Sequence, residues 1–271
     1  PFNVRSKESG LHGVTLHTGL PVIYLDTEEG KPIVSKEDYL TASLTLWNEE
    51  SGPEEALACS VRGRGNTTWG YPKKPYALKF ESRQEVLGMP ANTRWDLLAN
   101  WMDRTNLRND VSFEVARRTS LAWTPRCEFV ELVLNGEHEG LYNFVEHIKR
   151  GPERVPVSEK GFIVEFDKNY DEAYQFRTAL LNFPAMVKKP DEPDAEGFAG
   201  IRQFINGAEA AIVNQSSPRE WVDYESFADY WIVEELCHNG EMVHPKSTYA
   251  YRDSSGLLFM GPVWDFDWGT F

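Results

Sequence analysis

Apolar and polar residues alternate along much of the N-terminal portion of the chain, as they do in strands with one buried face. The alternating segments are also rich in β-branched and aromatic residues, which favour strands. Asn135-Gly136 lies between two of them, and this dipeptide favours the tight turn of a hairpin. The predicted strands are residues 20–26, 41–47, 58–64, 76–81, 129–134, 140–146 and 161–167. We expect the first four to form an antiparallel sheet.

A helical spacing of apolar residues replaces this alternation in three places. Asp103 stands where a helix N-cap would, and the spacing predicts a helix to about residue 118. Residues 196–215 and 223–238 are also predicted helices, and the second is apolar on most faces, so we expect it to be buried. The polar, proline-rich residues 182–197 are predicted to form a loop between two halves. The predicted closing strands are residues 249–252, 257–260 and 263–268, which makes the whole pattern α+β.

Composition narrows the class of protein. Hydrophobic residues make up 41% of the 271, which is enough for a folded core. The formal net charge of −14 repels phosphate backbones, so nucleic acid is disfavoured as the main partner. The scattered Cys59, Cys127 and Cys237 are expected to be free thiols. No apolar run is long enough to span a bilayer. The chain opens on Pro1 without a signal sequence, and we expect a processed or trimmed start, which leaves the compartment open.

The most informative stretch is the sequence GPVWDFDW at residues 261–268. Side chains alternate in a strand, so Asp265 and Asp267 are expected on one face and three large aromatic residues on the other. Hard cations such as Mg²⁺ are bound by one or two carboxylates together with substrate phosphates. The segment therefore predicts a rigid metal-binding pair. The alternative is two ordinary aspartates in water at the end of a strand.

A basic segment follows the third predicted strand. Arg62, Arg64 and Asn66 occupy alternating positions between glycines, and small residues there let a backbone approach a ligand closely. A cationic cluster on a rigid sheet is what a polyphosphate site requires. The alternative is a solvated basic edge strand. Neither the G-x-G-x-x-G pattern, a Walker A motif nor an H-R-D loop is present, so a standard kinase is not predicted. The lysines of this segment are Lys73, Lys74 and Lys79.

Three further polar residues stand at the ends of predicted elements. Asn239 and Glu241 lie just past the helix of residues 223–238 and could hold a metal or orient an attacking hydroxyl. The alternative for Asn239 is a helix-capping role. Glu146 ends a predicted strand, where it would need a cationic partner such as Lys79 if buried, or would simply lie in water.

Taken in order, these pieces resemble the CotH (spore coat protein H) kinase family from about residue 20 to the last residue. The resemblance rests on an ordered series of motifs, which is more specific than any of its members. The series is RGRGNTTW at 62–69, KKPYALKF at 73–80, LLAN at 97–100, LRN at 107–109, LNG at 134–136, GLY at 140–142 and GPVWDFD at 261–267.

The resemblance implies an atypical protein-kinase-like fold of two lobes that binds ATP and a divalent metal and phosphorylates Ser or Thr on proteins. Family members are largely exported, so an extracytoplasmic location is implied. After an irregular lead-in at residues 1–19, the resemblance implies one domain over 20–271. Its sheet-rich part would be about 20–181, and its helical part, about 196–271, would end in strands.

The resemblance also implies roles for individual residues. Asp265 and Asp267 match the metal-binding aspartates of the family, and Asn239 and Glu241 match an Asn-x-Asp element that precedes them. Glu241 stands where Asp is expected, which gives a longer arm. Family members continue beyond the position of Phe271, so part of the C-terminal lobe is expected to be missing. The nucleotide-side residues are Arg62, Arg64, Asn66, Lys74, Lys79 and Glu146.

The resulting hypothesis is Mg²⁺-dependent phosphoryl transfer from ATP to a protein hydroxyl. Asp265 would hold metal at the reacting centre, Lys79 with Arg64 would contact phosphates, and Glu241 would orient or deprotonate the acceptor. One alternative is a pseudokinase that binds nucleotide without transfer. Another is a surface protein that binds glycan or protein through exposed aromatic residues.

Overall fold

The structure is a computed structural model that describes residues 3–5, 13–15, 18–243 and 245–271. The chain divides into two compact units, residues 1–106 with 126–147 and residues 107–125 with 148–271. Most of the predicted lead-in lies outside the described residues. Its described parts form two short paired strands, β1 (Asn3–Arg5) and β2 (Gly13–Thr15).

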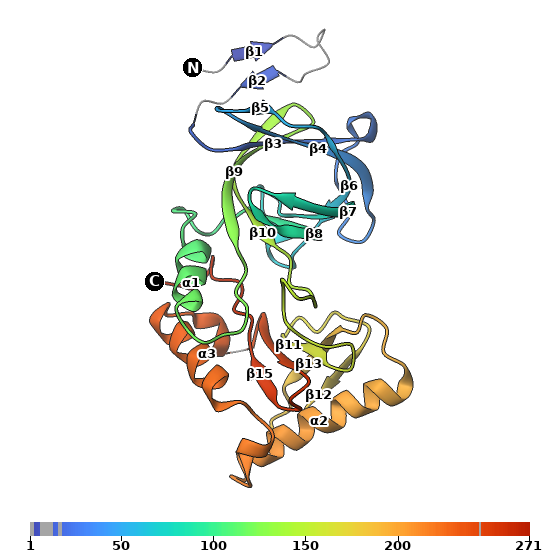
Figure 1. Cartoon of the computed structure of the whole chain (residues 1–271), viewed down its shortest axis with the longest axis vertical. Helices are drawn as coiled ribbons and strands as arrows, with labels where there is room; N and C mark the ends of the chain where they lie inside the picture. The colour runs from blue at the N-terminus through green and yellow to red at the C-terminus, as the bar shows by residue number, and fades with distance from the viewer. Residues whose placement is uncertain (1–2, 6–12, 16–17, 244) are drawn as a thin grey trace. The chain divides into compact units, whose positions relative to one another are not determined.

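The first unit is a closed barrel of seven strands (Figure 1). The strands follow the order β3-β9-β10-β8-β7-β6-β4, and β4 pairs back to β3. Every neighbouring pair is antiparallel except β3 and β9, which run parallel. The strands are β3 (Val22–Thr27), β4 (Leu40–Asn48), β6 (Leu57–Gly63), β7 (Tyr76–Val86), β8 (Met89–Leu98), β9 (Cys127–Leu134) and β10 (Glu137–Glu146), and the two-residue β5 (Gly52–Pro53) extends from β4.

Alternation along each strand fills the barrel with apolar side chains. On β7, Tyr76, Leu78 and Phe80 belong to the buried core, while Lys79 between them is exposed. The predicted Asn135-Gly136 hairpin is confirmed, and both residues have the positive φ that a tight primed turn needs. Burying one face of every strand without leaving a sheet edge is what barrel closure achieves.

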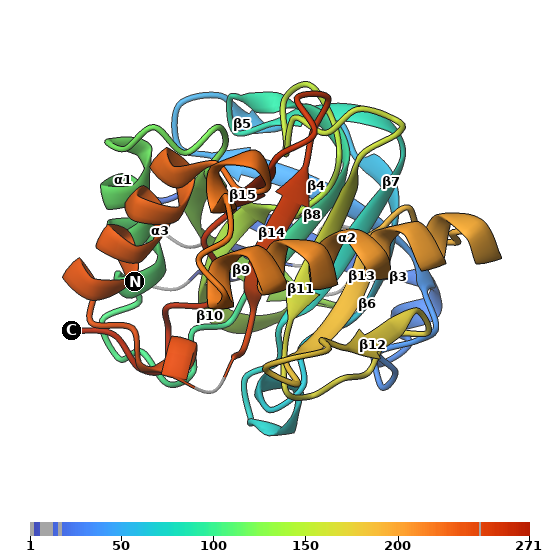
Figure 2. The ribbon, with the colours of Figure 1, turned by 90° about the horizontal axis from the view of Figure 1, so that it is seen from below.

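The second unit is built on a five-stranded antiparallel sheet with the order β12-β13-β11-β14-β15. Helix α2 (Ala195–Val213) crosses one face of this sheet (Figure 2) and buries Ile201, Ile205 and Ala208 against it. Asp194 caps the helix by accepting a hydrogen bond from the Gly197 N–H. The strands are β11 (Phe162–Phe166), β12 (Gln175–Arg177), β13 (Pro184–Lys189), β14 (Thr248–Arg252) and β15 (Leu258–Met260).

Two shorter helices pack beside each other in the second unit, α1 (Arg108–Arg117) and α3 (Tyr224–Leu236) (Figures 1 and 2). Helix α1 begins five residues after the predicted N-cap. Asp103 instead accepts hydrogen bonds from the Thr105 N–H and hydroxyl, which forms a turn before the helix. The remaining short helices are the 3-10 turns η2 (Glu28–Gly30), η3 (Thr68–Gly70), η4 (Pro218–Glu220) and η5 (Gly240–Val243).

The predicted fold class is wrong. The described residues are 35% strand and 21% helix, with a closed seven-stranded barrel and three α-helices, rather than a two-lobed kinase-like fold with a helical C-terminal part. The C-terminal part is organised around a sheet rather than around helices, because β11 pairs with β14 and with β13, which lies in residues 182–197 that were predicted as a loop. Closure was missed because alternation along a strand reveals its buried face but not its neighbours.

Two local predictions also fail. Residues 263–268 form no strand, and Asp265 has a φ of 69°. Helix α3 is not buried all round, since Trp231 is 57% exposed and Leu236 is 66% exposed. Its apolar residues occupy more of its circumference than the unit covers.

Candidate functional site

Three acidic residues from separate segments meet in the second unit. Glu241 lies in η5, just past α3, Asp167 follows β11, and Asp265 lies after β15. Ser247 joins two of them, because its hydroxyl donates to Asp265 Oδ2 at 3.2 Å and its N–H donates to Asp167 Oδ2 at 3.0 Å. Lys246 completes the cluster, with its Nζ 3.2 Å from Glu241 Oε1. We call these five residues the acidic cluster.

Negative charge exceeds positive charge in the acidic cluster. Burial raises the pKa of Glu241, and the charges of Asp265 and Asp167 raise it further, while Lys246 opposes them. Burial likewise raises the pKa of Asp167, although the backbone N–H groups of Asn169 and Ser247 partly offset this. Glu241 is 2% exposed, and its Oε2 is buried without a hydrogen-bond partner. A single lysine therefore leaves these carboxylates repelling one another, which is the condition a bound cation relieves.

The segment that carries Asp265 is anchored by its aromatic neighbours. Trp264 and Phe266 are buried and both contact Phe113 of α1, with ring centroids 6.0 and 6.2 Å away. The Phe266 N–H donates to Asn109 Oδ1 at 2.9 Å. The left-handed backbone of Asp265 lies between these two anchors. Two of the three predicted aromatic anchors are thus buried, in an irregular segment, whereas the third, Trp268, is 51% exposed.

Asp265 and Asp267 do not form the predicted pair on one strand face. The left-handed conformation of Asp265 breaks the alternation that the prediction assumed. Asp267 is 7% exposed, and its main-chain carbonyl accepts a hydrogen bond from Arg108 at 3.2 Å. The role of Asp267 as a metal ligand remains a prediction.

Asn239 connects the acidic cluster to α3. Its side-chain oxygen accepts a hydrogen bond from the Glu241 N–H at 3.1 Å, and its side chain also bonds Glu234. Burial raises the pKa of Glu234 to about 7, Glu241 adds to this, and bonds from Asn239 and Tyr230 oppose it. Asn239 therefore forms a turn after α3, whose C-cap is Cys237. This turn fixes the Glu241 backbone and so helps to position the cluster.

A metal ion can be tested against these donors. Among the residues that the structure describes, no three His, Cys, Asp or Glu side chains form a ready-made cage. Mg²⁺ does not require one, since it commonly takes one or two carboxylates and completes its shell with phosphate and water. The orphaned Glu241 Oε2 and the repulsion between Glu241 and Asp265 fit such a site.

In the first unit, several charged or ionisable side chains surround one buried carboxylate, that of Asp96 on β8. Arg64 Nε lies 3.3 Å from Asp96 Oδ1, and His147 Nδ1 lies 2.9 Å from Oδ2. Burial alone would raise the pKa of Asp96, but Arg64, His147 and Arg62 outweigh it and hold the pKa below its usual value. We call these four residues the arginine hub. Two of the predicted phosphate ligands are thus brought together.

Strand register explains the arginine hub. Arg62, Ala77, Asp96 and Val145 stand in one row across β6, β7, β8 and β10. Side chains in a row share a face, and the small Ala77 leaves room for the Arg62 guanidinium to act on Asp96. The same guanidinium also lies 5.2 Å from the centre of the Tyr39 ring.

The other predicted nucleotide-side residues have separate partners. Lys74 Nζ donates to the Trp69 carbonyl at 2.6 Å and lies 5.3 Å from the centre of that ring. Asn66 Oδ1 accepts a hydrogen bond from Lys36 at 3.0 Å. These partners lie outside the arginine hub, so the nucleotide-binding roles of Lys74 and Asn66 stay predictions.

Lys79 and Glu146 do not pair as predicted. Glu146 is fully buried, and its carboxylate accepts a hydrogen bond from the Arg126 N–H at 3.0 Å and lies 3.5 Å from the Arg126 guanidinium. Its cationic partner is therefore Arg126, and the alternative of a carboxylate in water is also wrong. Lys79 is exposed on the outer face of β7, in register with Ser60 and Arg94.

Several residues of these clusters were not predicted. Asp96 and His147 on one side, and Asp167, Lys246 and Ser247 on the other, escape sequence reasoning because their partners lie far along the chain. Of these residues, only Asp167 had a local signal in the sequence, and it was weak. Asp167 is the last residue of the predicted strand 161–167, and polar residues at the ends of strands often serve a site.

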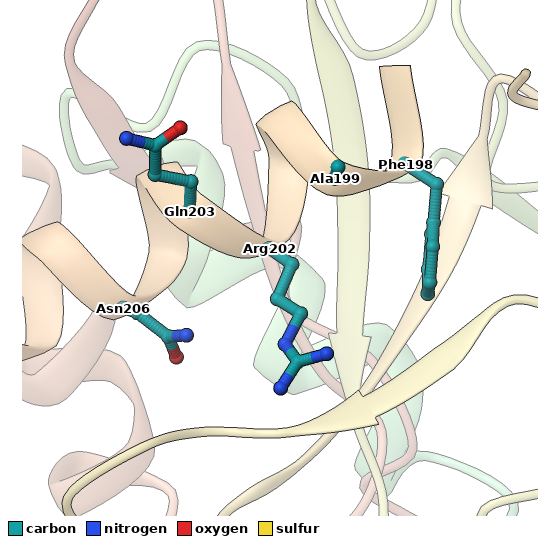
Figure 3. A pocket seen from close by; sticks show the side chains of 5 residues that line it. All are labelled: Phe198, Ala199, Arg202, Gln203 and Asn206. Carbon is teal, nitrogen blue, oxygen red and sulfur yellow. The ribbon is translucent and has the colours of Figure 1, made fainter. Parts of the chain in front are cut away.

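A shallow hollow of about 380 Å³ lies along α2 (Figure 3). Phe198 and Arg202 project to the same side of the helix. None of the predicted site residues lines this hollow, and it contains no acidic side chain. Its lining residues are Phe198, Ala199, Arg202, Gln203 and Asn206.

A comparison with known protein families identifies the family of this chain. A family model described as CotH kinase protein matches residues 61–270. The chain belongs to the CotH kinase family, and this family suggests a kinase-like function. No curated protein matches the chain. None of the helices among the described residues is long and apolar enough to cross a membrane.

Proposed function

We propose that this protein transfers phosphate from ATP to a Ser or Thr hydroxyl of a protein, with a divalent cation such as Mg²⁺. The observation that carries the proposal is the mutual repulsion of Glu241, Asp265 and Asp167 in a chain of the CotH kinase family. Buried like charges without enough counter-charge are costly, and they concentrate where a protein handles metal or protons.

Three residues of the acidic cluster, Asp265, Glu241 and Lys246, take roles in the proposal. Asp265 and Glu241 would hold the cation, with Asp267 and Asn239 as predicted contributors. A bound divalent cation supplies charge neutralisation for the transferring phosphate. Glu241, whose pKa is raised by burial and by the neighbouring carboxylates, is also the proposed acceptor of the hydroxyl proton. Lys246 is 3.2 Å from Glu241 and would keep that carboxylate oriented.

We further propose that the arginine hub binds phosphate. Arg64 is held on its Nε side by Asp96, and a fixed guanidinium binds phosphate oxygens at a lower entropic cost than a mobile one. Lys79, which is exposed, is the proposed second phosphate ligand. Arg62, Asn66, Lys74 and Glu146 remain predicted contributors on the nucleotide side.

The partner and location belong to the same proposal. The acceptor is a protein rather than nucleic acid, because the net charge of −14 opposes nucleic-acid binding. An extracytoplasmic site of action follows from the resemblance to exported members of the family.

A catalytically impaired protein that still binds nucleotide is the second candidate. Glu241 stands where the family motif has Asp, and Asn239 is engaged in holding the Glu241 backbone. Both features shift the geometry of a metal site. ATP binding without phosphotransfer would distinguish this candidate.

The deciding experiment is calorimetric titration of ATP with and without Mg²⁺. The proteins are the wild type, an Asp265→Asn/Asp267→Asn variant, and an Asp191→Asn/Glu192→Gln control that removes two exposed carboxylates outside both clusters. We expect Mg²⁺-dependent binding in the wild type and control, and at least about a hundredfold loss in the first variant. Absence of binding by the wild type, or equal binding by all three proteins, would contradict the proposal. Radiolabel transfer to a denatured protein acceptor then separates the kinase from the nucleotide-binding alternative.

A further inference from the structure

Helix α3 presents a broad apolar surface to solvent. Tyr224, Trp231, Ile232 and Leu236 are 40%, 57%, 43% and 66% exposed. At 100° per residue they lie within one arc of about 140° on the helix, and the opposite arc is buried. Single exposed apolar residues are common, but a contiguous set on one helix face usually marks an interaction surface. We call this arc the α3 face.

Neighbouring elements leave the α3 face uncovered. The opposite side of the helix packs into the unit through Tyr230, Val233 and Cys237, which are all buried. The segment that follows α1 is joined to the edge of α3, where Asp229 accepts hydrogen bonds from the N–H and hydroxyl of Ser120. The apolar residues of the α3 face therefore exceed what the folding of this unit uses.

Acidic residues accompany the apolar ones. Glu225 and Glu235 are exposed on the same arc, and α3 carries no Lys or Arg. They lie ten residues apart, which on a helix is about 15 Å. Arg219 lies beyond the N-terminal end, stacked on Tyr224 with 4.3 Å between the guanidinium carbon and the ring centre. The α3 face is therefore apolar and negative, within a chain whose net charge is −14.

We propose that the α3 face is a docking site for a basic amphipathic helix of a partner protein. Such a helix would place apolar residues at i, i+3 and i+4 spacing against Trp231, Ile232 and Leu236. Its Lys or Arg side chains would reach Glu225 and Glu235. A second copy of this chain fits less well, because two α3 faces would bring like charges together without a counter-charge.

The test uses a fluorescent synthetic helix of Leu and Lys with one apolar face, and a matched helix in which Glu replaces Lys. Binding to the full chain is followed by fluorescence anisotropy. We expect the basic helix to bind and the acidic helix to bind at least about tenfold more weakly. Trp231→Ser/Leu236→Ser should weaken binding of the basic helix by about tenfold or more. Glu225→Gln/Glu235→Gln should weaken it and reduce its salt dependence.

A matched control separates docking from general attraction to an acidic protein. Leu180 and Leu181, at the tip between β12 and β13, are 53% and 50% exposed, and Leu180→Ser/Leu181→Ser should leave binding unchanged. Equal loss in both serine variants, or equal binding of both helices, would overturn the proposal. Sedimentation of the protein alone tests whether a second copy occupies the α3 face. A dimer that dissociates in Trp231→Ser/Leu236→Ser would assign the α3 face to a second copy instead.

Discussion

The arginine hub and the acidic cluster are both built on a buried carboxylate, but their charge balances are opposite. Asp96 is surrounded by more positive charge than it can neutralise, and its pKa falls. Glu241 is surrounded by other carboxylates and one lysine, and its pKa rises. A carboxylate with a depressed pKa stabilises the fold when it is ionised. A carboxylate with a raised pKa destabilises the fold when it is ionised. The difference indicates that the acidic cluster is kept for function although it lowers the stability of the fold.

The first prediction tests the stabilising side of this comparison and carries the largest expected effect. Asp96→Asn leaves Arg62, Arg64 and His147 without their shared anion, and removing one partner of a buried ionic group costs about 4 kcal/mol. We expect the urea midpoint of the barrel to fall accordingly. Trp95, which is buried and stacked on Phe144 with centroids 5.0 Å apart, supplies a fluorescence signal from the same unit.

Glu131→Gln is the control for this prediction. Glu131 is also a buried carboxylate of the barrel, and it pairs with His138 at 2.7 Å rather than with an arginine. Its loss should cost less than the loss of Asp96. Equal losses of stability in the two variants would show that the arginine hub contributes no more to stability than another buried carboxylate of the barrel.

The secondary structure of the arginine hub and of the barrel could largely be predicted from the sequence, since alternation and the Asn-Gly turn are local signals. The closure of the barrel could not. It depends on β3 pairing with both β4 and β9, and the parallel β3–β9 pair joins segments far apart in the chain. Strand patterns contain no information about such partners.

The acidic cluster was predictable only in part. The structure brings the predicted Glu241 and Asp265 together, while their functional roles remain predictions. The predicted strand geometry was wrong, because Asp265 has a left-handed backbone and residues 263–268 form no strand, although Trp264 and Phe266 are buried. Asp167 could not be found, because Ser247 brings it to Asp265 through tertiary contacts alone.

The second prediction concerns Glu234, which lies behind the acidic cluster and has a pKa of about 7. The folded protein holds this proton more tightly than the unfolded chain, whose glutamate pKa is 4.5. Stability from Glu234 is therefore complete below about pH 4.5 and is lost as the pH rises through 7. The loss should amount to roughly 2–3 kcal/mol.

Glu234→Gln should remove this pH dependence, because a neutral amide replaces the neutral acid in a site that is 2% exposed. The measurement is the urea unfolding free energy at about pH 5 and pH 8. The exposed Asp191→Asn is the control and should keep the wild-type slope. If Glu234→Gln loses as much stability with rising pH as the wild type, another group carries the effect.

The third prediction differs from the first in the direction of the expected change in stability. Glu241→Gln is the counterpart of Asp96→Asn, but it removes a charge that Asp265 and Asp167 repel. Lys246 loses one partner and keeps the field of the two remaining carboxylates. We therefore expect the free energy of unfolding to stay constant or to rise by up to about 1 kcal/mol in the absence of metal.

Stability in the presence of Mg²⁺ and ATP completes this prediction. Ligands that bind only the folded state stabilise it in proportion to their affinity, so the wild type should gain more from them than Glu241→Gln does. The variant would then be the more stable protein without ligand and the less stable one with it. A variant destabilised by several kcal/mol without ligand would mean that the ion pair with Lys246 outweighs the repulsion. Glu241 would then resemble Asp96, and the contrast between the two clusters would not hold.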